Sequence, residues 1–79
     1  MITEHLPKQS ARESTLALAR RHVILGEVLV ARQMAIVEQL RRQGHDSAHA
    51  ERLLATLRQS LNAMREHLQL EATASLNHR

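Results

Sequence analysis

The stretch HVILGEVLVARQMAIV, residues 22–37, decides the fold of this 79-residue chain. Its apolar residues recur at the three- and four-residue spacing of an amphipathic helix. They cover roughly half of the helix surface, which is more than a single neighbouring helix can shield from water. This helix is therefore predicted to pack against two partners.

The composition favours an all-α protein of one domain. The chain contains 2 Gly and 1 Pro, no Phe, Tyr or Trp, and many strong helix formers. Chains of this length bury little apolar surface, so they are often stabilised by disulfides, a metal or self-association. Because the chain has no Cys, disulfides and thiolate metal sites are excluded and self-association is favoured.

The net charge and the hydropathy of the chain limit which partners and which cellular compartment we expect. The formal net charge is +3, from 11 Lys and Arg against 8 Asp and Glu, which is mildly basic. No apolar run approaches the roughly 18 residues that span a membrane, and the beginning of the chain lacks the apolar core of a signal peptide. We expect a cytoplasmic protein without a membrane partner or a cofactor.

Local signals divide the chain into two helices joined by a turn. Ser10 and Glu13 have the spacing of a capping box at a helix start. Gly44 suits the left-handed position that follows a helix end, and Asp46 suits the N-cap of the next helix. The predicted organisation is a flexible segment over 1–9, a helical hairpin over 10–72 and a frayed tail over 73–79; within the hairpin, the helices cover about 11–42 and 47–71, and the turn covers 43–46.

Two apolar rows run along the first helix. One row is predicted to form the hairpin seam with the second helix. The other row is predicted to pack against the first helix of a second molecule, which would give a homodimeric, antiparallel four-helix bundle. The alternatives are a monomer with an exposed apolar face, or a different protein that occupies this face. The predicted seam comprises Val23, Gly26, Val30, Gln33 and Val37 with Leu57, Leu61 and Met64, and the predicted interface comprises Leu18, Leu25, Leu29 and Ile36.

The position of the turn predicts which residues oppose each other across the hairpin. Residues whose numbers add up to about 89 should lie at the same level. Gly26 should then face Ala63, which would let the two helices approach closely. Gln33 should lie near Thr56, either hydrogen-bonded to it inside the seam or reaching solvent with its long side chain.

The six His are the residues that invite a chemical role. His22 and His67 are predicted to approach each other across the hairpin, either as weak candidates for metal ligands or as half-buried imidazoles at the edge of the core. His45 and His49 have H-x-x-x-H spacing, but His45 falls in the turn. No nucleophile is paired with a base and no Gly-rich phosphate loop exists, so no catalytic residue and no enzyme activity is predicted.

Nucleic acid is not expected as a partner. The arginines are scattered among glutamates around both helices, and no aromatic side chain is present to stack on bases. A dimeric bundle of hairpins nevertheless resembles the architecture of the Rop-type RNA-binding regulators, so a Rop-like nucleic-acid-binding regulator is the alternative function. The aromatic residue on the RNA face of that family has no counterpart in this chain.

A further pattern extends over about fifty residues and comprises His22, Val23, Gly26, Glu27, Val30, Gln33, Val37 and Leu40, GHD at 44–46, Leu53, Leu54 and Leu57, and REH at 65–67. By this pattern the chain resembles a group of short alpha-proteobacterial helical-hairpin proteins without an assigned activity. Members of that group are more polar near positions 24, 25, 28 and 29, where this chain has Ile, Leu, Val and Leu. Together these observations predict a non-catalytic interaction or regulatory protein that self-associates through its first helix, with a His-based metal-binding protein as a further alternative.

Overall fold

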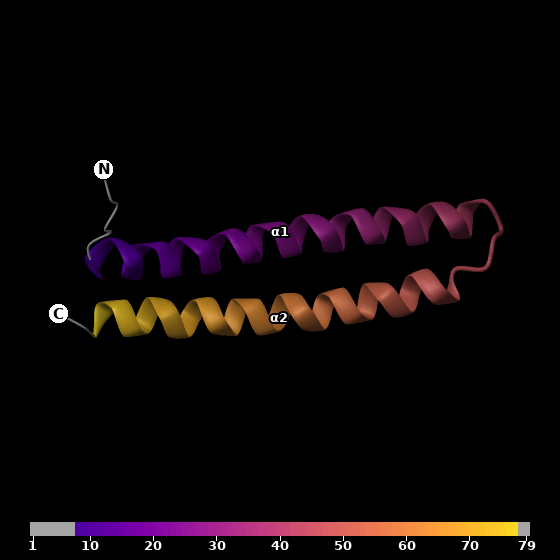
Figure 1. Cartoon of the computed structure of the whole chain (residues 1–79). Coiled ribbons are helices and arrows are strands. Elements are labelled where there is room, and N and C mark those ends of the chain that lie inside the picture. Colours follow the sequence, from indigo (N-terminus) through magenta and orange to yellow (C-terminus); the bar gives the residue numbers. More distant parts are fainter. Residues whose placement is uncertain (1–7, 78–79) are drawn as a thin grey trace, which may run out of the picture.

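The protein is a helical hairpin. The computed structural model describes residues 8–77, with side chains from residue 15 onward, and contains helices α1 (Lys8–Arg42) and α2 (Ala48–Leu76). The helices lie side by side in opposite directions, joined by a short connection (Figure 1). At 1.5 Å per residue they are about 52 and 44 Å long. The all-α hairpin predicted from the sequence is confirmed, and residues 8–77 contain no strand.

The beginning of α1 differs from the prediction. The helix starts at Lys8, so the backbone is already helical before Ser10. The prediction that Ser10 is the N-cap is therefore wrong, and residues 8 and 9 do not belong to a flexible segment. The rest of that predicted segment, residues 1–7, lies outside the described residues.

The far end of α2 also corrects the prediction. The helix continues to Leu76, and the Asn77 N–H donates to the Thr73 carbonyl at 3.0 Å. The frayed tail predicted from residue 73 is thus wrong for 73–76, while residues 78 and 79 lie outside the described residues. Ala72 and Ala74, just before and within this stretch, have the highest helix propensity of any residue type and offset the weaker helix formers beside them.

The connection is built on the predicted glycine. Gly44 has φ +73°, a conformation that side chains with a Cβ rarely adopt. Its N–H donates to the Arg41 carbonyl at 3.0 Å, and the His45 N–H donates to the Leu40 carbonyl at 2.8 Å. This pair of bonds is the Schellman motif, which satisfies two carbonyls at the end of α1.

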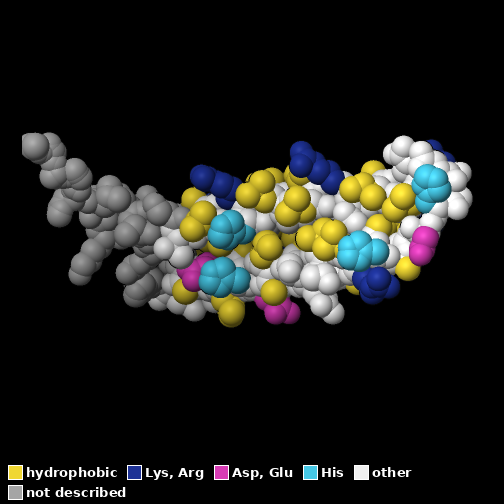
Figure 2. Space-filling model, turned by 45° about the vertical axis from the view of Figure 1, so that its right-hand side comes forward, with side chains coloured by type: hydrophobic (Ala, Val, Ile, Leu, Met, Phe, Trp, Pro, Cys, Tyr) yellow, Lys and Arg dark blue, Asp and Glu magenta, His cyan; other side chains and the backbone are white. Residues whose placement is uncertain are grey.

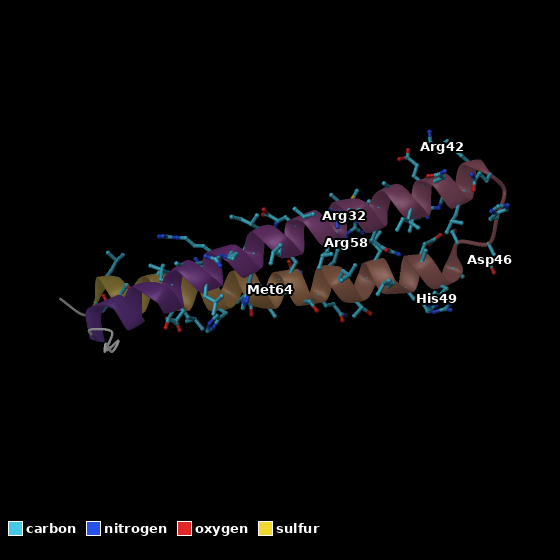
Figure 3. The ribbon with its side chains drawn as sticks, turned by 45° about the horizontal axis from the view of Figure 1, so that its top comes forward. Arg32, Arg42, Asp46, His49, Arg58 and Met64 are labelled. Carbon is cyan, nitrogen blue, oxygen red and sulfur yellow. The ribbon has the colours of Figure 1, made fainter. Side chains whose placement is uncertain are left out.

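Side chains around the start of α2 satisfy one of its free N–H groups and link it to α1. Asp46, seen in the connection in Figure 3, accepts a hydrogen bond from the Ala48 N–H at 3.0 Å, although Ser47 occupies the N-cap position predicted for Asp46. The Ser47 hydroxyl donates to the Glu51 carboxylate, and the Arg41 guanidinium lies 3.1 Å from the same oxygen. These two interactions, the first more than the second, lower the pKa of Glu51 below 4.5.

The seam predicted from periodicity forms the core. All of its predicted residues are buried or half-buried, and Val37 packs with Ala50 and Leu54 near the turn. No described side chain is less than 2% exposed. Two helices enclose a seam from two sides only, so the hairpin alone has a thin core.

Gly26 lies where the helices approach closely. A Cβ added there would lie 3.0 Å from Leu61 Cδ1 and 3.4 Å from Met64 Sδ. The predicted pairing of Gly26 with Ala63 is wrong, because Ala63 is exposed on the side of α2. The level along the axis was predicted well, but counting residues from a turn does not say which direction a side chain takes around its helix.

Gln33 is the polar residue buried in the seam. It is 8% exposed, and its Nε2 donates to the Ala50 carbonyl at 3.0 Å. Thr56 instead donates its hydroxyl to the Arg52 carbonyl within α2. The predicted Gln33–Thr56 hydrogen bond and the alternative of a solvated Gln33 are both wrong, because a backbone carbonyl of α2 lies within reach of the amide.

Candidate interaction surface

The hairpin has two broad faces, and ion pairs mark one of them. On this charged face, Arg41 contacts Glu51 and Arg65 contacts Glu27, each with an N–O distance of 3.1 Å. Both pairs join α1 to α2 and are about half exposed, so water and salt screen them and each contributes little to the stability of the hairpin. Their signs nearly balance, so the charged face gives no concentrated field.

An open groove of about 660 Å³ runs along the charged face near the turn. Met34 and Ala35 of α1 and Ala55 and Arg58 of α2 contribute to its walls. These residues belong neither to the predicted seam nor to the predicted interface row.

The apolar row of α1 lies on the opposite side of the hairpin. The position of His22 shows this. His22 lines a small pocket together with Met64 and His67, and this pocket lies on the side of the seam away from Glu27. The row residues lie 3, 4, 7 and 14 positions from His22, which puts them on the same side of the helix as His22. We call this the apolar face; it is formed by Leu18, Leu25, Leu29 and Ile36 of α1 and by Leu53 of α2.

The side chains of the apolar face are exposed in the single chain. Leu18 is 49% exposed, Leu25 52%, Leu29 46% and Ile36 47%, and Leu53 on α2 is 43% exposed. Figure 2 shows hydrophobic side chains along the hairpin with histidine side chains among them. Leu53 belongs to this face because Met64 and His67 follow it by 11 and 14 positions, near whole numbers of helical turns.

The histidines at this face offer limited chemistry. His22 and His67 line a pocket of about 210 Å³, as expected from their predicted approach across the hairpin. Both side chains are exposed, so the prediction of half-buried imidazoles is wrong. The His67 Nε2 lies 3.8 Å from the Glu71 carboxylate, one turn further along α2. No group of three or more His, Cys, Asp or Glu suited to hold a metal ion occurs among the described residues. Metal binding by His22 and His67 stays a hypothesis.

Comparison with protein-family models, curated proteins and solved structures gives no match for this chain. The resemblance to alpha-proteobacterial hairpin proteins accordingly stays a prediction. Within the described part of the chain, neither helix has the length and apolar character needed to cross a membrane.

Proposed function

We propose that the chain is a non-catalytic helical interaction protein that self-associates through the apolar face of α1. The observation that carries this proposal is the row of half-exposed Leu18, Leu25, Leu29 and Ile36 on one side of a hairpin with a thin core. Contiguous exposed apolar patches on small proteins usually mark interaction sites. A second hairpin placed on this row would complete a four-helix bundle with a shared core.

The size of the face suits a stable dimer. With α2 about 44 Å long and two helices about 20 Å wide, the face of one hairpin measures about 880 Å². Stable protein interfaces bury about 800 Å² on each partner. Because the chain has no Cys, it is also suited to a reducing compartment, and we propose a cytoplasmic location.

Light scattering on a sizing column across protein concentration tests the proposal. We expect a dimer for the parent chain. Leu25→Glu combined with Leu29→Glu should weaken dimerisation at least about 1,000-fold, because each charge buried without a partner costs several kcal/mol. Far-UV circular dichroism should show that the helices are retained, since both side chains are half exposed in the hairpin.

A matched double variant controls for added charge. Leu70→Glu combined with Leu76→Glu introduces the same charges at side chains of α2 that are 70% and 72% exposed and lie outside the apolar face. This control should remain dimeric. A parent chain that is monomeric at every concentration would overturn the proposal, and so would an unchanged dimer mass for the Leu25 and Leu29 variant.

A further inference from the structure

We infer that α1 packs antiparallel against α1 of a second copy, with the twofold axis at the level of residue 27. This inference rests on the proposed function and gives the interface its direction and its register. Its first basis is the spacing of residues on the exposed side of α1. Successive steps of 4, 3, 4, 3 and 4 positions describe the two core positions of a coiled-coil heptad, occupied here by Leu18, His22, Leu25, Leu29, Arg32 and Ile36.

The second basis is the symmetry of this row. The numbers of Leu18 and Ile36 add up to 54, as do those of Leu25 and Leu29. An antiparallel copy at this register therefore places each of these four apolar side chains opposite an apolar side chain. All four are about half exposed in the single hairpin, so each has surface left to bury.

The polar members of the row favour the same direction. His22 and Arg32 also add up to 54, so the antiparallel arrangement places the exposed Arg32 opposite the partner's His22. The long Arg side chain can lay its methylene groups over the imidazole while its guanidinium reaches water. A parallel arrangement would instead place each Arg32 opposite its own copy, and directly opposed like charges destabilise helix pairs.

Val28 gives a further indication. It lies outside the row but is 40% exposed, next to the level of the inferred axis. In the antiparallel arrangement Val28 flanks the seam and meets its own copy across the axis, which covers one further apolar side chain in each subunit. The acidic neighbour at the axis does not interfere, because Glu27 turns to the charged face and pairs with Arg65.

Disulfide cross-linking tests the direction and the register, because the parent chain has no Cys of its own. Leu18→Cys and Ile36→Cys are made separately, the second with an added tag that shifts its mass. The two variants are unfolded together in urea with reductant, refolded as a mixture and then oxidised. In the inferred dimer the two positions face each other, so the mixed disulfide should form in high yield.

Each Cys variant oxidised by itself should give no disulfide-linked dimer. In the inferred dimer, the two copies of position 18 lie about 27 Å apart along the axis, as do the two copies of position 36. A disulfide joins Cα atoms only about 4.4–6.8 Å apart, so neither variant should cross-link to itself. Asn62→Cys, exposed on α2, is the control for random collision and should give no disulfide in either experiment.

The outcomes separate this inference from the proposed function. Self-linked single variants with no mixed product would indicate a parallel dimer, which overturns the antiparallel inference and leaves self-association intact. A dimer mass without any disulfide would place the interface elsewhere and also overturns the inference. A monomeric parent chain would overturn the proposed function itself. Spin labels attached at Val28→Cys supply a second measurement, since the inferred dimer predicts a short distance there and a long one at Ile36→Cys.

Discussion

Replacing Gly26 by a large residue should force the two helices apart. A Cβ added to Gly26 would lie 3.0 Å from Leu61 Cδ1 and 3.4 Å from Met64 Sδ, and Leu61 is only 5% exposed. Gly26→Leu adds three further carbon atoms beyond that point. Overpacking of a seam costs about 1–3 kcal/mol or more. The better helix propensity of Leu offsets about 1 kcal/mol of this cost, so we expect a net loss of up to about 2 kcal/mol.

A second substitution, at Leu61, isolates the free-energy cost of the clash between the new side chain at position 26 and Leu61. Leu61→Ala alone should cost about 2–5 kcal/mol, because it leaves a cavity in the core. In the double variant, the new Leu at position 26 fills that space. The stability loss of the double variant should therefore be smaller than the sum of the two single losses by about 1–3 kcal/mol. Urea unfolding followed by circular dichroism, at one fixed protomer concentration, measures all four stabilities.

Two results would refute this reasoning. One is additivity of the Gly26 and Leu61 substitutions within about 0.5 kcal/mol, the range expected for sites that do not touch. The other is a stabilised Gly26→Leu variant, which would mean that helix propensity outweighs crowding. Ala17→Leu, at an exposed position of α1, is the matched control and should leave stability nearly unchanged.

Three further predictions concern the connection and the buried amide. Gly44→Ala should cost about 1–2 kcal/mol in urea unfolding, because φ is +73° while the space around the glycine is open, and an unchanged midpoint would contradict the strain. Gln33→Leu should unfold within about 1 kcal/mol of the parent chain in the same assay, because the substitution removes both the hydrogen bond and the cost of burying the amide. A larger loss of stability would show that the hydrogen bond contributes more than the burial of the amide costs. Glu51 has a lowered pKa, so its interactions with Ser47 and Arg41 stabilise the fold above pH 4.5 and are lost as the pH falls through the lowered value. Glu51→Gln should therefore be less stable than the parent chain near neutral pH and nearly equal to it in strong acid, and a difference independent of pH would exclude this mechanism.

Features that depend on a few neighbouring residues could be predicted from the sequence. The seam is one example, because helical spacing by itself decides which side chains share a side of α1. Gly44 is another, since a glycine after a helix that ends in two arginines is a local signal. The exposed row from Leu18 to Ile36 belongs here as well, because a half-apolar helix with one neighbour must leave one side uncovered.

The helix ends were harder to predict. Ser10 has the residue type of an N-cap but lies inside α1, and the stretch 73–76 contains weak helix formers but belongs to α2. Each end is decided by small differences in backbone free energy, in which a cap contributes about 1 kcal/mol and a single propensity less. Such differences are easily outweighed by neighbouring residues.

By itself, the sequence determined that the chain forms two helices, that they fold back at Gly44, and that α1 has more apolar surface than one neighbouring helix can cover. Only the tertiary structure decided that Gly26 meets Leu61 and Met64, that Gln33 bonds to the Ala50 carbonyl, and that both ion pairs between the helices lie on the face away from the leucine row. The physical reason is rotational. Helical periodicity orders side chains around each helix separately, whereas the rotation of α2 against α1 results from the packing of the whole seam, in which no short segment has a deciding share.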